Sequence, residues 1–116
     1  MAVVQIGNRL VGDDQPCYIV AEIGINHNGS IDLAKRLISV AVAAGCDAVK
    51  FQKRTIEVVY SPEELAKPRE NPFGTTNGDL KHGLEFGEEE YEEIDAFCKS
   101  VKMQWFASPW DEQSVD

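Results

Sequence analysis

The stretch AEIGINHNG, residues 21–29, concentrates side chains that can take part in chemistry. It contains the carboxylate of Glu22, two asparagines, a histidine and two glycines, and it directly follows the apolar run CYIV. A carboxylate at the end of a strand can manage protons or bind hydroxyl groups. The glycines do not have the G-x-G-x-x-G spacing of a phosphate-binding loop. The stretch is therefore either a simple turn or the edge of an active site.

Polar residues in two later apolar segments show a related pattern. Alternate residues of a strand point to the same side, so Lys50 and Gln52 share one face of their segment. Glu22 and Ser108 likewise lie near the C-terminal ends of their own segments, and in each segment the opposite face is apolar. We expect these four side chains to converge on one pocket at the ends of parallel strands. An alternative is that Glu22 and Lys50 form a buried ion pair that only joins neighbouring strands.

The other polar residues of the opening stretch favour a turn. Asn28 and Gly29 both tolerate positive φ, so they are expected to turn the chain. For His27, a structural role is favoured over metal ligation, because the only other histidine, His82, does not form a helical H-x-x-x-H pair with it. Asn26 and His27 stand at the rim, where they could touch a substrate or brace the loop.

Three strands and two helices would position these residues. The strands are expected at 17–23, 47–52 and 103–108, and the helices at 30–44 and 88–101. The first strand is almost entirely apolar, as a strand buried on both faces would be. The alternation of strands and helices predicts an α/β fold with a parallel sheet and right-handed crossovers. A β/α barrel and a doubly wound sheet both fit this pattern.

Two further segments lie outside this alternation. Residues 3–6 and 9–11, separated by a Gly-Asn pair, predict a short N-terminal β-hairpin. The predicted organisation is this hairpin, over residues 1–14, followed by one α/β segment, over residues 15–116. Residues 53–87 form a connection much longer than a usual βα loop, and such connections are more often functional than idle. Their prolines and glycines predict mostly irregular chain, with one short helical turn at SPEELAK.

Composition excludes several classes of protein. The 116 residues carry a formal net charge of −9, which argues against nucleic acid as a partner, because phosphate backbones favour clustered Lys and Arg. No apolar run reaches the roughly 18 residues that a membrane span needs, and the N-terminus lacks a signal-peptide pattern. Cys17, Cys46 and Cys98 are odd in number and form no C-x-x-C pair. We therefore expect reduced thiols and a cytoplasmic protein.

Four motifs resemble the N-terminal part of the sialic acid synthase family, the N-acetylneuraminate synthases and their relatives that make similar nine-carbon sugar acids. They are IVAEIGINHNG, AGCDAVKFQK, LKHGLEF and WFASPWDEQSVD, in this order from about residue 17 to the end of the chain. The resemblance implies a TIM (β/α)8 barrel, of which residues 15–116 would be the first three βα units. It also implies condensation of phosphoenolpyruvate with an N-acetylmannosamine-type sugar, free or phosphorylated.

The resemblance implies roles for five residues. Glu22 would be catalytic, because it would bind sugar hydroxyls or manage protons at the condensing carbons. Lys50 would neutralise the carboxylate or phosphate of phosphoenolpyruvate. Gln52 and Ser108 would contact substrate, and Asn71 in the long connection would touch the sugar. The enol carbon would attack the open-chain aldehyde, water would add to the resulting cation, and phosphate would leave by C–O cleavage.

The chain is shorter than the family pattern requires. A β/α barrel needs about 250 residues, so we expect a truncated segment that is inactive and poorly stable alone. The resemblance implies a divalent metal, Mn or Mg, that polarises the aldehyde and is bound by histidines of later strands. It also implies a homodimer in which an antifreeze-like C-terminal domain closes the partner's site. The alternatives are a non-catalytic remnant or binding module, and another phosphoenolpyruvate-dependent aldol-type barrel synthase.

Overall fold

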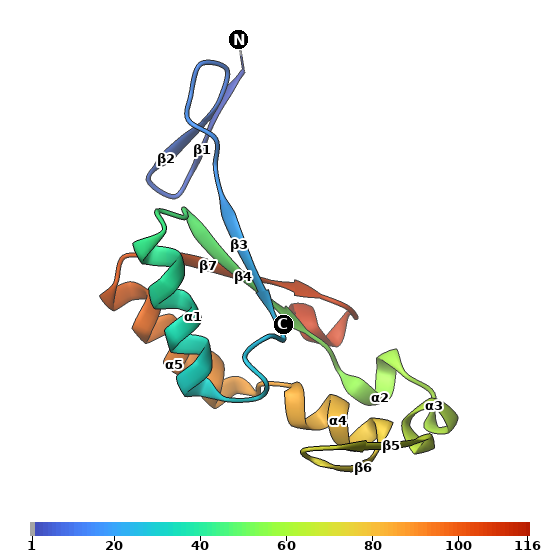
Figure 1. The fold of residues 1–116 in the computed structure, drawn as a ribbon. Coiled ribbons are helices and arrows are strands. Elements are labelled where there is room, and N and C mark those ends of the chain that lie inside the picture. Colours follow the sequence, from blue (N-terminus) through green and yellow to red (C-terminus); the bar gives the residue numbers. More distant parts are fainter. Residues whose placement is uncertain (1) are drawn as a thin grey trace.

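A three-stranded parallel sheet lies at the centre of the fold (Figure 1). The computed structural model describes residues 2–116. The elements in chain order are β1 (Val3–Ile6), β2 (Arg9–Gly12), β3 (Val20–Gly24), α1 (Ile31–Ala43), β4 (Ala48–Lys53), α2 (Ile56–Val59), α3 (Pro62–Ala66), β5 (Pro68–Asn71), β6 (Gly74–Thr76), α4 (Asn77–Leu84), α5 (Glu88–Ser100), β7 (Gln104–Pro109) and the 3-10 turn η1 (Gln113–Val115). The central sheet has the order β3–β4–β7. The predicted alternation of parallel strands and helices is thereby confirmed.

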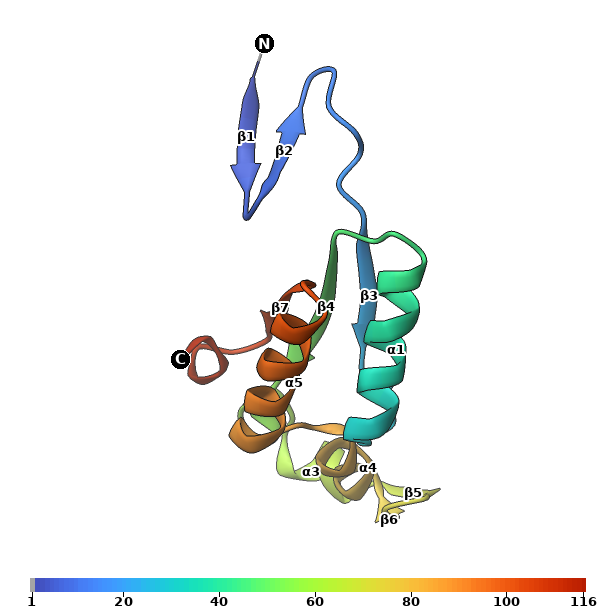
Figure 2. The same cartoon turned by 90° about the vertical axis from the view of Figure 1, so that its left-hand side faces the viewer.

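Helices α1 and α5 lie side by side on one face of this sheet (Figure 2). Apolar side chains from both helices and from the strands fill the space between the layers. The buried ones are Ile23, Ala34, Ile38, Ala41, Val49, Phe51, Phe86, Ile94, Cys98 and Met103. Burial of this surface is the main favourable term that holds the layers together. The core therefore fixes the strand register, and with it the side chains on the opposite face.

Local signals set the ends of the two covering helices. The Ser30 hydroxyl accepts a hydrogen bond from the N–H of Leu33 and caps α1, as the sequence predicts. The helix ends before Gly45, whose φ of 81° is readily adopted only by glycine. At the start of α5, the Glu90 carboxylate accepts a hydrogen bond from the N–H of Gly87 at 2.9 Å. Both helices thus begin and end close to the predicted positions.

The first strand of the sheet differs from the prediction in two ways. β3 begins at Val20 rather than at residue 17, and the preceding N–H of Ile19 donates to the side chain of Asp47. The expected burial on both faces is wrong, since Val20 is 38% exposed. Among residues 2–116, helices cover only one face of the sheet (Figure 2). The apolar run identified a strand, but it could not show what covers the second face.

The connection over residues 53–87 is also more regular than predicted. It contains the short helices α2 and α3, the β5–β6 hairpin and helix α4, and only the α3 turn was expected. Capping explains the difference. Ser61 caps α3 and Pro62 occupies its first position, while Thr76 and Asp79 form a reciprocal capping box at the start of α4. These polar signals outweigh the prolines and glycines nearby.

The N-terminal strands β1 and β2 pair antiparallel and project from the end of the sheet where its strands begin (Figure 1). An ion pair of 2.6 Å between Arg9 and Asp47 links β2 to the turn before β4. Asp47 also accepts the Ile19 N–H, so one carboxylate joins the hairpin, β3 and β4. None of the helices in residues 2–116 has the length and apolar character that crossing a membrane requires.

Candidate functional site

A hollow of about 360 Å³ lies where the three parallel strands end. We call it the strand-end hollow. It is lined by Glu22 and Gly24 of β3, by Lys50 and Gln52 of β4, by Ser108 of β7 and by Trp110 directly after β7, together with two residues of the β3–α1 loop. The strand register explains this convergence, because Lys50 lies beside Glu22 and Gln52 lies beside Ser108. Four of the five site residues predicted from the sequence are thus brought together.

The two charged residues of the hollow form an ion pair. Lys50 Nζ lies 2.7 Å from Glu22 Oε2. The Glu22 side chain is 54% exposed and the Lys50 side chain 29%. Within residues 2–116 the pair is therefore not buried, unlike the pair in the alternative interpretation. Exposed ion pairs contribute little stability, so the pair is open to exchange its contact for one with a ligand.

Backbone geometry at the end of β3 opens the hollow. The strand register shifts between Glu22 and Gly24, and Gly24 has a φ of 58°. A side chain at Gly24 would stand 3.3 Å from the Glu22 carboxylate and 3.8 Å from the side-chain oxygen of Gln52. Glycine therefore leaves free the space between these two polar groups. Asn26 lines the rim and donates its amide to the carbonyl of Ile23 at 3.0 Å.

The following turn packs closely against α4. Asn28 and Gly29 have φ values of 54° and 76°, in agreement with the predicted turn. A side chain at Gly29 would collide with the carbonyl oxygen of Gly83 at the end of α4. Glycine is therefore required at Gly29 by both the backbone conformation and the close approach. The turn joins the first strand of the sheet to the far end of the long connection.

His27 has a structural position. It is 2% exposed, and its ring stacks on Phe86 with centroids 3.8 Å apart. Its Nδ1 accepts a hydrogen bond from the N–H of Gly29 at 3.0 Å. Burial lowers the pKa of His27 to about 4, so the ring is neutral at pH 7. The preference for a structural histidine is confirmed, and His27 braces the turn.

Asn71 is the one predicted site residue that lies away from the hollow. It ends β5, and its side chain is used within the β5–β6 turn. The amide group donates to the carbonyls of Arg69 and Thr76, and the side-chain oxygen accepts the N–H of Phe73 at 2.9 Å. The structure therefore gives Asn71 a turn-forming position and no contact with the other four residues.

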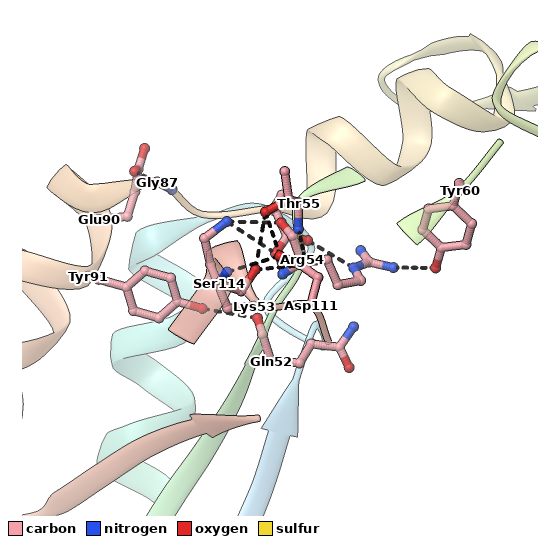
Figure 3. A network of polar contacts seen from close by, with 11 residues as sticks. Gln52, Lys53, Arg54, Thr55, Tyr60, Gly87, Glu90, Tyr91, Asp111 and Ser114 are labelled. Carbon is pink, nitrogen blue, oxygen red and sulfur yellow. Dashed lines mark hydrogen bonds and ion pairs between the residues drawn. The ribbon is translucent and has the colours of Figure 1, made fainter. Parts of the chain in front are cut away.

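A second polar cluster, which no sequence pattern indicated, lies beside the hollow (Figure 3). Arg54 follows β4 and is 3% exposed. Its backbone N–H and its Nε both donate to the Glu85 carboxylate, at 2.7 and 3.0 Å, and Nη1 donates to the Tyr60 hydroxyl at 3.0 Å. Its Nη2 has no partner within residues 2–116. Arg54 and Glu85 are far apart in sequence, so no local spacing could reveal the pair.

Asp111 forms the other half of this cluster. Its carboxylate accepts hydrogen bonds from the N–H and hydroxyl of Thr55, at 2.7 and 2.9 Å, and from the N–H and hydroxyl of Ser114, both at 2.9 Å. Desolvation alone would raise the pKa of Asp111, but these hydrogen bonds outweigh it and hold the pKa at about 2. The cluster thus ties the end of β4 to the chain after β7.

Metal binding finds no support among residues 2–116. No group of three or more His, Cys, Asp and Glu side chains in this range could hold a metal ion. His27 is buried against Phe86, and the other histidine, His82, pairs with Glu57 at 2.8 Å on the surface. The residues present therefore do not fit the divalent metal that the resemblance implies, and we assign no chemical step to a metal held here.

Comparison with known proteins gives a consistent set of similarities. A profile of the NeuB family matches residues 37–116. The N-acetylneuraminate-9-phosphate synthase of Mus musculus is 39% identical over 110 residues, which are 93% of this chain and 31% of that protein. The N,N'-diacetyllegionaminic acid synthase of Legionella pneumophila is 35% identical over 90% of this chain and 30% of that protein.

A solved structure shows the same fold. The N-acetylneuraminic acid (sialic acid) synthetase of Leptospira borgpetersenii, solved in complex with citrate, superposes with a TM-score of 0.78 and 26% identity. The match covers 98% of this chain and 36% of that one. The chain spans about a third of the length of the curated relatives that it matches.

Proposed function

Because this chain belongs to the NeuB family, we propose that it is the first part of an enzyme that condenses phosphoenolpyruvate with an N-acetylmannosamine-type sugar to give a sialic-acid-type nonulosonic acid. The named relatives from Mus musculus and Legionella pneumophila make sugar acids of this type, which supports the proposal. The β3–β4–β7 sheet would then be the first three βα units of a β/α barrel. Its strand-end hollow would be one wall of the active site, at the rim where barrel chemistry takes place.

The reaction gives four polar residues of the hollow a role. The enol carbon of phosphoenolpyruvate attacks the aldehyde carbon of the open-chain sugar and forms the new C–C bond. Water then adds to the cation at the neighbouring carbon, and phosphate leaves by C–O cleavage. Lys50 neutralises the carboxylate or phosphate of phosphoenolpyruvate, and Glu22 binds sugar hydroxyls or manages the protons at the condensing carbons. Gln52 and Ser108 hydrogen-bond to substrate.

One observation carries the proposal: Lys50 and Glu22 are paired at 2.7 Å in a hollow at the strand ends that also presents an amide and a hydroxyl. The protein as a whole is strongly acidic, with a formal net charge of −9. A trianionic substrate therefore needs a local cation, and Lys50 is the one that lines the hollow. When Lys50 leaves Glu22 and binds a carboxylate or phosphate of the substrate, its ammonium group stays paired with an anion.

Several features of the whole enzyme complete the proposal. The divalent metal, Mn or Mg, would need ligands from outside residues 2–116. The active enzyme would be a homodimer, and this segment alone would have no activity. Three free cysteines, with Cys98 buried in the core, favour a reducing compartment and therefore a cytoplasmic location. Asn71, whose side chain is bonded within the β5–β6 turn, would touch the sugar from the long connection.

Turnover by the complete synthase tests the proposal. The protein is incubated with phosphoenolpyruvate and, in separate reactions, with N-acetylmannosamine, its 6-phosphate and a diacetamido hexose. We expect phosphate release that depends on one of these sugars, with a nine-carbon acid identified by mass. A product from a shorter aldose, or phosphate release without a new acid, would instead support another phosphoenolpyruvate-dependent synthase. The 116-residue chain alone should give no product.

A further inference from the structure

Trp110 is an exposed aromatic side chain at the edge of the strand-end hollow. It is 52% exposed, although large aromatic side chains usually bury most of their surface. The other tryptophan, Trp105, packs against the core and donates its indole N–H to Asp95 at 3.0 Å. An exposed indole beside a polar hollow is a feature of ligand-binding sites, where one apolar surface accompanies a few hydrogen-bonding groups.

The chain around Trp110 is held firmly although its ring is exposed. The Trp110 N–H donates to the carbonyl of Lys53 at 3.0 Å. The next residue, Asp111, accepts four hydrogen bonds from Thr55 and Ser114. The guanidinium carbon of Arg54 lies 5.6 Å from the centre of the indole ring, within the range of a cation–π contact. A ligand that packs on this ring therefore loses little free energy to ordering the side chain.

The ligands of the proposed reaction differ in how they suit an indole. Phosphoenolpyruvate is small and densely anionic, and the negative face of an aromatic ring does not attract anionic oxygens. A hexosamine-type sugar has C–H surfaces between its hydroxyl groups and carries an N-acetyl methyl group. Its hydroxyls can bond to Glu22 and Gln52 while its C–H surface packs on the ring. In the hollow, Lys50 is therefore suited to bind the anionic phosphoenolpyruvate, and Trp110 is suited to pack against the sugar.

We propose that Trp110 is a specificity-determining residue that packs on the C–H surface of the acceptor sugar. This inference rests on the proposed function, because it assigns the sugar subsite of that same hollow. Arg54 is a positioning residue for it: held by Glu85 and Tyr60, the guanidinium supports one side of the indole. Arg54 thus links the polar cluster of Figure 3 to the residue that would select the sugar.

Steady-state kinetics of the complete synthase tests this assignment with three substitutions. Trp110→Ala should raise the KM for the sugar roughly fivefold to tenfold and leave the KM for phosphoenolpyruvate within twofold. Trp110→Phe, which keeps an aromatic face, should restore most of the sugar affinity. Trp110→Leu is the matched control, since it keeps apolar volume without that face, and it should behave like the alanine variant.

Three results would overturn the proposal. They are an unchanged sugar KM in Trp110→Ala, an equal rise in both KM values, and a leucine variant that matches the phenylalanine variant. If the wild-type enzyme turns over none of the sugars, the proposed function fails, and saturation-transfer NMR with N-acetylmannosamine then decides the Trp110 assignment separately. Binding to the wild type that is lost in Trp110→Ala supports it, and no binding to the wild type rejects it.

Discussion

Two ion pairs at the C-terminal ends of the strands differ in almost every physical respect. Glu22 and Lys50 meet through a single contact of 2.7 Å, with side chains 54% and 29% exposed. The side chains of Arg54 and Glu85 are only 4% and 10% exposed. Arg54 donates from its backbone and from two side-chain nitrogens to Glu85 and Tyr60. The first pair faces the strand-end hollow, and the second joins the two ends of the long connection.

The difference separates a binding group from a supporting group. Charges withdrawn from water must be bonded within the protein, and the Arg54–Glu85 pair uses most of its capacity in this way, with only Arg54 Nη2 left without a partner in residues 2–116. It therefore contributes to the fold and has little left to offer a ligand. The Glu22–Lys50 pair has side chains that are 54% and 29% exposed, and a substrate can replace the solvent at these exposed parts. Exposure and bonding, rather than charge alone, identify the candidate catalytic pair.

The largest effect is expected from Arg54→Met. Loss of the guanidinium removes the Nε donor and the closest cation from the nearly buried Glu85 carboxylate, which keeps only the backbone N–H of residue 54 and Lys53 Nζ at 3.8 Å. The free energy of unfolding should therefore fall by about 3–5 kcal/mol. Urea unfolding of the protein measures this change. The matched control is Lys50→Met, whose partner Glu22 is already solvated and whose loss should be less than about 1 kcal/mol. Equal losses in the two variants would remove the distinction between the pairs.

The next effect concerns His27, which stacks on Phe86 beside the buried pair. Its pKa is about 4 in the folded protein, against about 6.5 when unfolded, so the unfolded chain binds more protons between these pH values. Stability is then unaffected by His27 above pH 6.5 and should fall by about 3 kcal/mol as pH drops from 6.5 to 4.

Unfolding curves over this pH range test the histidine. His27→Asn should remove that part of the pH dependence, whereas His82→Asn should leave it, because His82 is on the surface. An unchanged pH slope in His27→Asn would show that the buried ring does not carry the effect.

At the solvated pair, the expected effect is on activity. Lys50→Met should lower kcat/KM for phosphoenolpyruvate about 100-fold, or about 2.7 kcal/mol of transition-state stabilisation, while the protein stays folded. Lys99→Met is the matched control: this lysine also pairs with one carboxylate, Asp95, at 2.7 Å, but its side chain is 76% exposed on α5 and lies outside the hollow. Its effect should stay below about fivefold. Near-normal turnover in Lys50→Met would reject the site assignment.

The smallest effect is expected for Ser108→Ala, which removes one neutral hydrogen bond from the hollow. A loss of about 1 kcal/mol corresponds to roughly a fivefold fall in kcat/KM. Ser100→Ala, at the exposed end of α5, should leave kinetics unchanged and controls for the loss of a hydroxyl. If both variants behave alike, Ser108 makes no contact with substrate that matters to the rate.

The sheet and its face assignment could be predicted from the sequence because both depend on short-range periodicity. Alternation within β4 places Lys50 and Gln52 together whatever the rest of the chain does. The N-cap at Ser30 and the turn at Asn28 and Gly29 are similarly local signals. Such patterns depend on a few neighbouring residues, and they were sufficient to place four polar side chains in one hollow.

The remaining features depend on contacts between distant parts of the chain. Arg54 meets Glu85 only because α2, α3 and α4 fold the connection back on itself, and no spacing rule contains that information. The role of Trp110 is hidden for the same reason, since its support comes from Arg54 and from Thr55 through Asp111. The role predicted for Asn71 rests on the resemblance alone, and the structure places its side chain inside the β5–β6 turn.

The junction between Arg54 and Glu85 also bears on how such proteins can diversify. It closes the connection at its base, so residues 55–84 form an excursion whose two ends are fixed side by side. Changes of length or sequence within that excursion need not alter the strand register or the groups on the strands. Residues 55–84 can therefore change while the strands that carry the hollow keep their geometry.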